Sequence, residues 1–309
     1  MVLASGVLFA VNGTVAKLIL QAGIDPQRLT LLRAVGAGAG LMLIAILLGG
    51  GFSRLRLSLR ELPLLIAYGL TGFFLVPMLY FVSISRIPVG IALLFEYTAP
   101  LFVALWARFG EHHRVHARLW WGLALCLAGL ACVAEIWGDL RLDAIGVAAG
   151  LACAVLLGAY YVLGSHGVQR RDTVSLTGWA FTVSAIAGLA YQLITGGSGA
   201  HADGWRPLSA TTPGGTPVWL LAVYLVVLGS IVPYLLVVGA MKHLPATSVG
   251  IIGMIEPVVA GAVAWFALGE ALNVAQLAGG ALLLAGVGLA ETARISDRPV
   301  VMVGESLNA

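Results

Sequence analysis

Ten long apolar stretches follow one another along the chain, separated by short polar connections. A helix that crosses the hydrocarbon core of a bilayer needs about 20 predominantly apolar residues. A transmembrane β-barrel is excluded because the apolar residues run continuously and do not alternate with polar ones. The pattern therefore predicts an all-α polytopic membrane protein with ten transmembrane helices, at residues 2–20, 28–50, 62–84, 87–108, 118–136, 143–164, 173–195, 217–240, 246–268 and 271–291.

The composition excludes a soluble globule and a disordered chain. Of the 309 residues, 60% are hydrophobic and 10% are charged, and the mean hydropathy is +0.99. A soluble domain carries about 25% charged residues. Ten spans of about 20 residues occupy about 200 residues of the chain, which leaves no room for a separate soluble domain. The first apolar run has no basic leader and no small-residue cleavage site, so we expect a first transmembrane helix and not a signal peptide.

Lysine and arginine residues are distributed unequally between alternate connections. One set of connections holds eleven of them and the other set holds four. The side with the excess faces the cytoplasm in most membrane proteins, so both termini are predicted to be cytoplasmic. The net charge of +3 is small, and its place in the loops indicates membrane orientation and not nucleic-acid binding.

The chain contains an internal repeat. Shifting the sequence by 157 residues superposes a set of matched glycines and prolines, namely Gly72 on Gly229, Pro88 on Pro245, Pro100 on Pro257, Gly122 on Gly279 and Gly129 on Gly286. Each unit holds five predicted helices, and an odd number requires the second copy to be threaded through the membrane in the opposite direction. We therefore expect two inverted five-helix repeats, residues 1–137 and 138–293, followed by a cytoplasmic tail at 294–309. Inverted repeats are frequent in secondary transporters.

Two related groups of motifs give the chain a family resemblance. The second half carries Leu244-Pro245-Ala246-Thr247-Ser248, Glu256-Pro257-Val258-Val259, Trp265 and Gly269-Glu270. The first half carries Ile87-Pro88-Val89-Gly90, Pro100-Leu101-Phe102-Val103-Ala104 and Gly110-Glu111, with Asn12-Gly13, Lys17 and Arg33-Ala34 upstream. Over residues 1–292 the sequence resembles the EamA family of the drug/metabolite transporter superfamily.

The stretch Pro88 to Ala92 followed by Glu96 to Pro100 is similar to a segment of bacterial amino-acid exporters of the threonine/homoserine or aromatic type. The resemblance implies an exporter of amino acids or related small metabolites in the bacterial inner membrane. One position departs from the family, because the usual tryptophan near Ala10 to Asn12 is absent.

Two carboxylates lie near the middle of predicted spans. Glu96 is about ten residues into its span and Glu256 about eleven into the equivalent span of the second repeat. Ionisable side chains within a membrane usually face a cavity or a partner. Both are therefore candidates to attract a substrate ammonium or to take up a proton. The alternative is that each hydrogen-bonds to backbone groups released by the nearby proline.

Other polar side chains within the predicted spans are candidates for substrate contact. Lys17 and Arg33 lie toward the outer ends of the first two helices, where either could meet a substrate carboxylate or extend to the lipid headgroups. Asn12 lies near the centre of the first helix and needs hydrogen-bond partners there, from substrate or from another helix.

Aromatic and proline residues within the spans complete the set of candidates. Amphipathic rings suit a pocket that contacts a small solute, and the candidates are Tyr80, Tyr97, Trp179 and Tyr234. Prolines free carbonyl groups and permit bending, which makes four positions candidate hinges or fixed kinks: Pro77, Pro100, Pro233 and Pro257.

The sequence contains no HExxH, GxSxG or Walker motif, so no catalytic residue, cofactor or metal is expected. A metal at His112, His113 and His116 is an alternative to an ordinary solvated loop. The favoured function is export of a small molecule across the lipid bilayer by alternating access. A proton-coupled multidrug exporter is the main alternative, and a membrane-embedded enzyme or sensor is a further one. The substrate, proton coupling and oligomeric state stay open.

Overall fold

The computed structural model describes residues 1–47, 55–112, 115–134, 136, 143–194, 202–212, 215–259 and 273–295. Throughout these residues the regular elements are helices, apart from one isolated bridge between Thr211 and Pro217. The helices of the first half are α1 (Val2–Gln21), α2 (Pro26–Leu47), α3 (Leu62–Tyr68), η2 (Gly69–Leu75), α4 (Val76–Arg86), α5 (Val89–Glu96), α6 (Ala99–Phe109) and α7 (Ala117–Val133). Those that follow are α8 (Ala144–Gly167), α9 (Thr173–Ile194), η4 (Ala202–Ser209), α10 (Val218–Val226), η5 (Val227–Ile231), α11 (Val232–Ala240), α12 (Ala246–Gly253) and α14 (Val274–Ile295).

Eight of the described helical stretches are long and apolar enough to cross a bilayer. Three of these combine consecutive elements, at Leu62–Arg86, Val89–Phe109 and Val218–Ala240. Two shorter apolar helices, Ala117–Val133 and Ala246–Val259, occupy two more of the predicted spans. The second half of the predicted span 246–268 and most of the expected tail at 294–309 lie outside the described residues. The expected all-α, multi-pass fold is confirmed for the part of the chain that the structure describes.

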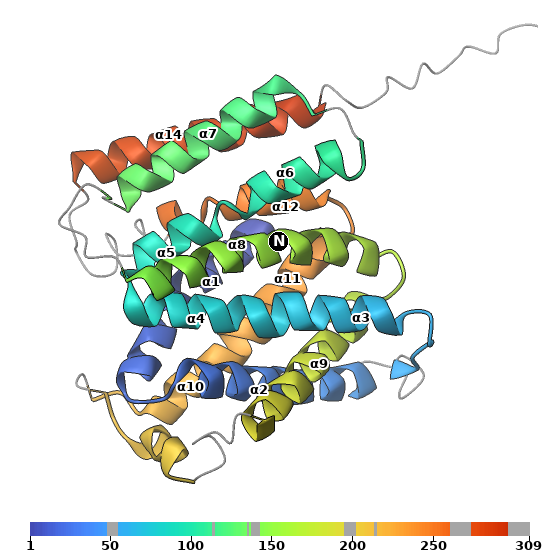
Figure 1. Cartoon of the computed structure of the whole chain (residues 1–309), viewed down its shortest axis with the longest axis vertical. Coiled ribbons are helices and arrows are strands. Elements are labelled where there is room, and N and C mark those ends of the chain that lie inside the picture. The colour runs from blue at the N-terminus through green and yellow to red at the C-terminus, as the bar shows by residue number, and fades with distance from the viewer. Residues whose placement is uncertain are drawn as a thin grey trace, which may run out of the picture.

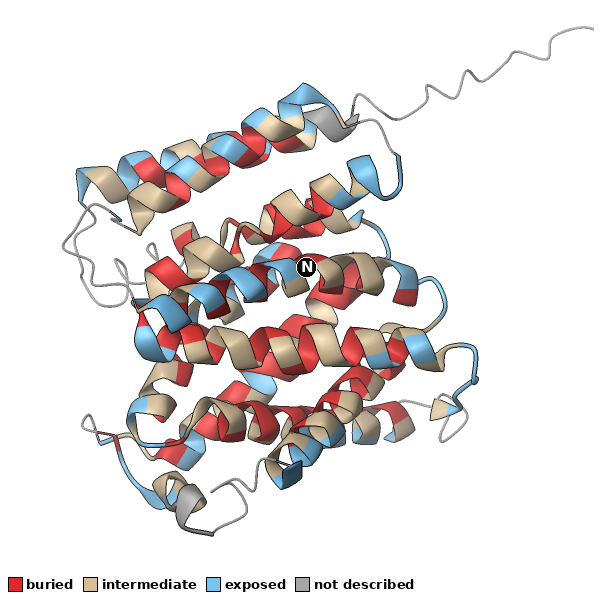
Figure 2. Ribbon diagram, viewed as in Figure 1, coloured by how far each residue is buried: buried red, intermediate tan, exposed pale blue. Residues whose placement is uncertain are grey.

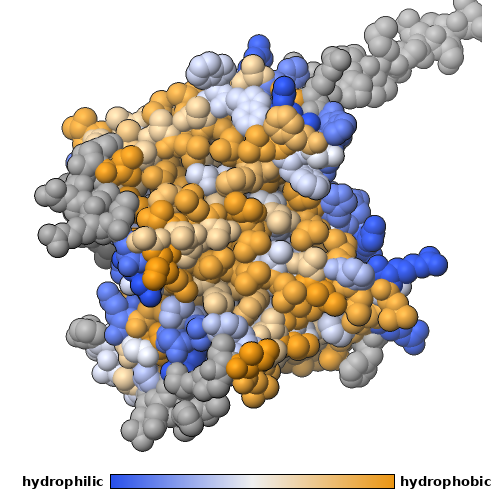
Figure 3. Space-filling view, in the orientation of Figure 1, coloured by the Kyte–Doolittle hydropathy of each residue, from blue (hydrophilic) through white to orange (hydrophobic). Residues whose placement is uncertain are grey.

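The surface of the helical block carries large apolar side chains. Figure 3 shows apolar residues across the middle of one face and hydrophilic residues toward its two edges. Ile186, Trp121 and Val223 are each more than half exposed, whereas the inner faces of the helices are buried (Figure 2). Soluble monomers rarely expose an apolar surface of this extent. A membrane protein turns such a surface toward the hydrocarbon of the bilayer.

The long helices pack in pairs that join distant parts of the chain. α7 lies along α14, α2 packs on α9, α4 on α8, and α1 on α11. The α7–α14 pair forms one edge of the block (Figure 1). Its helices meet at glycines: a Cβ added at Gly129 would lie 2.5 Å from the amide nitrogen of Leu283. Small residues allow this close backbone contact in a lipid solvent, where apolar side chains alone give little drive for association.

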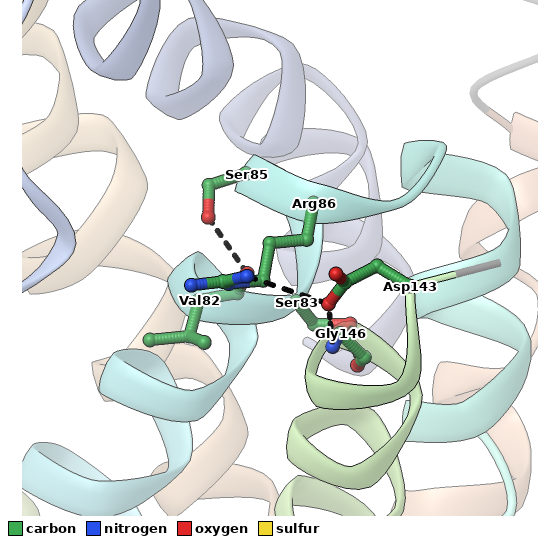
Figure 4. Close-up of polar contacts among 6 residues, drawn as sticks. All are labelled: Val82, Ser83, Ser85, Arg86, Asp143 and Gly146. Atoms are coloured by element: carbon green, nitrogen blue, oxygen red, sulfur yellow. Dashed lines mark hydrogen bonds and ion pairs between the residues drawn. The ribbon is translucent and has the colours of Figure 1, made fainter.

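Polar contacts tie helix ends of the two halves together. The Ser83 hydroxyl donates to the carbonyl of Gly146 at 2.9 Å, and Asp143 caps α8 by accepting from the Gly146 amide at 2.8 Å (Figure 4). Arg86 lies 3.5 Å from the same Asp143 carboxylate. At the opposite end of the spans, Arg171 forms an ion pair of 2.9 Å with Glu61.

Two prolines change the helical hydrogen-bonding pattern within long spans. Proline has no N–H to donate to the carbonyl four residues earlier, and its ring clashes with that carbonyl. Immediately before Pro77 and before Pro233 the chain forms π-helical segments, η2 and η5, in which hydrogen bonds reach five residues back. The carbonyl released by Pro77, that of Phe73, accepts a hydrogen bond of 2.8 Å from Ser184 on α9. Both prolines therefore lie at local distortions of the helix.

The other two prolines each follow a break in a span. α5 ends at Glu96, the next two residues form a turn, and α6 begins just before Pro100. α12 ends at Gly253, and helical residues resume at Glu256, just before Pro257. The missing proline N–H leaves the carbonyls of Glu96 and Gly253 without their usual helical donors. Each break therefore lies next to one of the two intramembrane carboxylates.

Candidate functional site

A cavity of about 100 Å³ lies between helices from both halves of the chain. A buried water needs roughly 10–15 Å³, so this volume accommodates several waters or a small solute. Its walls come from α1, α2, α4, α5, α8, α11, α12 and the helical turn after α12. The polar lining residues are Ser5, Asn12, Arg33, Tyr80, Glu96, Tyr97, Tyr160, Tyr161, Tyr234 and Glu256.

Both predicted carboxylates line this cavity. Glu96 is the last residue of α5, and Glu256 begins the turn that follows the break after α12. The Tyr97 hydroxyl lies next to the Glu256 carboxyl and interacts with it. The two helix breaks thus bring acidic groups from the two halves of the chain into a single chamber, where together they can attract a cation.

The predicted tyrosines Tyr80, Tyr97 and Tyr234 also line the cavity. The Tyr80 ring approaches α1 closely because residue 13 is glycine: a Cβ there would lie 2.7 Å from the Tyr80 hydroxyl oxygen. Tyr234 packs edge-on against Phe9, with ring centroids 5.6 Å apart. The chamber therefore combines aromatic walls with a few polar groups, which is typical of small-molecule sites.

Asn12 lines the cavity and lies against the π-helical segment η5 of the second half. Its side chain is buried, and its Oδ1 atom has no hydrogen-bond partner among the described residues. Gly229 contacts this side chain, and a Cβ at residue 229 would overlap Oδ1. Asn12 therefore lies at the junction between the cavity and the π-helical segment, with its amide oxygen buried against Gly229.

Arg33, for which the sequence left open a contact with a substrate carboxylate or snorkelling to the headgroups, also lines the cavity. The snorkelling alternative does not hold for it, because only 3% of the residue is exposed and its side chain lines the cavity. One terminal nitrogen donates to the Tyr234 hydroxyl at 3.4 Å, and the guanidinium carbon lies 5.3 Å from the centre of the Tyr234 ring. Tyr160 and Tyr161 on α8 also line the cavity and were not among the predicted site residues, although two adjacent aromatic residues deep in a span were a usable signal.

Several candidate residues lie outside the cavity. Lys17 is half-buried near the end of α1, and Trp179 packs against the core cluster around α9. Of the four prolines, Pro77 lines the cavity, whereas Pro100, Pro233 and Pro257 do not. The structure therefore brings together six of the eight predicted binding residues.

The described residues contain no group of three or more His, Cys, Asp or Glu side chains that could hold a metal ion. His112 and His116 are described, while His113 lies outside the described residues. The chamber itself offers two carboxyls, one guanidinium, one amide and several hydroxyls. These groups can bind a small polar solute through charge and hydrogen bonds.

Comparison with known proteins assigns the family. The model of the EamA-like transporter family matches residues 1–134 and 144–292. An uncharacterized transporter of Archaeoglobus fulgidus is 30% identical over 280 residues, covering 89% of this chain and 90% of that protein. The threonine/homoserine exporter RhtA of Escherichia coli is 27% identical over 223 residues, covering 70% of this chain and 67% of that protein.

A solved crystal structure shares the fold. It superposes with a TM-score of 0.72 at 21% sequence identity, covering 96% of this chain and 98% of that chain. The curated relatives are named as transporters and match the chain across most of its length. The sequence matches and the multi-pass helical fold together show that this chain belongs to the EamA-like transporter family.

Proposed function

We propose that this transporter exports amino acids or closely related small metabolites by alternating access to the central cavity. The observation that carries the proposal is the chamber itself, which Glu96, Glu256 and Arg33 line together between helices of both halves. Buried charges within a membrane are costly and usually serve a transport pathway. The name of the threonine/homoserine exporter from Escherichia coli supports an amino-acid substrate.

The pairing of helices supports two inverted five-helix repeats, residues 1–137 and 138–293. When the five spans of each half are matched in their order along the chain, the pair α2–α9 maps onto itself, as does the pair α7–α14. The pair α4–α8 maps onto the pair α11–α1. Such an arrangement suits a rotation that exchanges the two halves about an axis in the membrane plane, with the substrate site near that axis.

The paired helix distortions support alternating access. The π-helical segments before Pro77 and Pro233 occupy corresponding spans, and so do the breaks before Pro100 and Pro257. Helices bend at prolines and π-helical turns. In our proposal these four positions are hinges that let each half change its tilt while the cavity stays between them.

The proposed orientation has both termini in the cytoplasm of a bacterium, with the protein in the inner membrane. The excess of lysine and arginine in alternate connections supports it. The cavity is lined on α1 by residues from Val2 to Gly13, the N-terminal part of that helix. In this orientation the chamber extends toward the cytoplasmic side, as an exporter that receives substrate from the cytoplasm requires.

A test is counterflow of labelled amino acids in liposomes that contain the purified protein. We expect wild-type protein to exchange at least one amino acid, and E96Q to lose most of that exchange because the substrate ammonium loses a charged partner. E111Q is the matched control, since Glu111 lies in an exposed connection outside the cavity. Wild-type exchange by E96Q would remove Glu96 from the mechanism.

A multidrug exporter is the second candidate function, and the aromatic lining of the cavity favours it. Tyrosine rings beside carboxylates can bind lipophilic cations through cation–π and charge interactions. Adding a lipophilic cation to the counterflow assay distinguishes the two functions. Exchange of the cation without exchange of any amino acid would favour the multidrug exporter.

A further inference from the structure

The charges in the cavity are separated by sign. Arg33 enters from α2, where its guanidinium carbon lies 5.7 Å from the centre of the Phe181 ring and 6.0 Å from that of Phe81. The carboxyls of Glu96 and Glu256 enter from α5 and from the turn after α12. No ion pair within 4.0 Å joins Arg33 to either carboxyl in the described part of the chain.

The guanidinium of Arg33 is incompletely satisfied. A guanidinium carries five N–H donors, and the described residues provide one hydrogen-bond acceptor, the Tyr234 hydroxyl at 3.4 Å. The Nε atom is buried without a partner. The neighbouring rings stabilise the positive charge through their faces, but they accept no strong hydrogen bond. Burying a cation in this way is costly unless an anion joins it.

Arg28 shows the contrast on the same helix. It is also buried, at 6% exposed, but it forms an ion pair of 3.1 Å with Asp25 and does not line the cavity. Arg28 thus has its anion within the protein. Arg33 faces a chamber large enough for a small solute, and its charge acts on Glu96 only across a distance longer than an ion pair. An anionic group of that solute would therefore supply the direct ion-pair partner that Arg33 lacks among the described residues.

We propose that Arg33 binds the carboxylate of the transported molecule while Glu96 and Glu256 bind its ammonium, so that the substrates are zwitterionic α-amino acids. This inference rests on the proposed transport function and defines its substrate class. A planar guanidinium fork matches a carboxylate in a bidentate arrangement. A zwitterion presents both charges a few bonds apart, and the cavity offers complementary charges on different walls.

The test compares an amino acid with its own carboxamide, which keeps the ammonium and side chain but lacks the anion. Threonine and threoninamide compete for counterflow of labelled threonine in liposomes that contain the protein. Wild-type protein should bind threonine about 10- to 100-fold more tightly than the amide, the range expected for a hydrogen-bonded charge pair. R33Q should lose this preference, because the substitution should weaken the binding of threonine and leave the binding of threoninamide nearly unchanged.

Two further variants keep the outcome interpretable. R33K retains the charge without the planar fork and should show an intermediate preference. R28Q removes a buried arginine from the same helix and should keep the wild-type preference for threonine. Each variant is taken into the assay after it elutes from size-exclusion chromatography as wild-type protein does.

Failure of the inference and failure of the transport function give different results. If R33Q binds threonine and threoninamide more weakly by the same factor, or keeps the wild-type preference for threonine, Arg33 does not bind the carboxylate. If wild-type protein prefers the amide, the substrates are not recognised as zwitterions. Absence of counterflow for every amino acid tested with wild-type protein would instead overturn the proposed transport function itself.

Discussion

Side chains that line the cavity pack closely against neighbouring helices, and Asn12 against Gly229 is one example. Asn12 comes from α1 and Gly229 from the π-helical segment η5, so the contact joins the two halves of the chain. The glycine is required because a side chain at residue 229 would occupy the position of the Asn12 Oδ1 atom. Steric fit at this point fixes how closely α1 approaches the widened helix.

This contact predicts a rescue. G229A should destabilise the protein by about 1–3 kcal/mol, the usual cost of overpacking a buried site, and should lower its thermal unfolding temperature in detergent. In the double variant, N12A should restore most of the stability that G229A removes, because it deletes the side-chain atoms that would overlap the new Cβ. G288A is the control, since a Cβ at residue 288 meets nothing within 4 Å. Equal destabilisation by G229A with and without N12A would contradict the contact.

The sequence identified several site residues because their chemistry is costly in a membrane. Glu96, Glu256 and Asn12 could be predicted from their depth within apolar runs. Lys17 and Trp179 could not be excluded in the same way, because the face that a helix turns toward its neighbours depends on packing. For Arg33 the sequence left two alternatives open, because its distance from the helix end does not tell whether its side chain reaches lipid headgroups or an internal cavity.

Helices in this protein are shaped by their prolines as much as by their apolar length. The structure has a continuous span at Leu62–Arg86 where the sequence predicts 62–84, and a helix at Pro26–Leu47 where it predicts 28–50. The π-helical segments were not predicted, because proline marks a distortion without specifying its hydrogen-bonding pattern. That pattern depends on which neighbour accepts the released groups, and at Phe73 the neighbour is Ser184.

The Ser184 hydrogen bond is open to a direct test. S184A should destabilise the protein by about 1–2 kcal/mol, because the buried carbonyl of Phe73 loses its donor on α9. S85A is the matched control: that hydroxyl is exposed and bonds within its own helix, so its loss should change stability by less than about 0.5 kcal/mol. Thermal unfolding of the two purified variants measures the difference. Indistinguishable unfolding of S184A and S85A would show that the released carbonyl needs no support.

At the scale of the whole molecule, the described helices pack in pairs, several of which line the polar chamber, and the middle of the face in Figure 3 is apolar. Every helix pair described above joins a helix of the first half to one of the second half. A rotation of one half against the other would therefore move the walls of the cavity while the charged groups stay between them. This arrangement underlies our proposal that the cavity is reached from each side of the membrane in turn.

Access to a single cysteine in the cavity tests that proposal most directly. Leu157 lines the chamber from α8, and L157C in a background with Cys126, Cys132 and Cys153 replaced by alanine provides the reporter. A membrane-impermeant maleimide should label it both in intact cells and in inverted vesicles, and a transported amino acid should slow the labelling. Labelling from one side alone, unaffected by any amino acid that the protein exchanges, would contradict a central substrate site with alternating access.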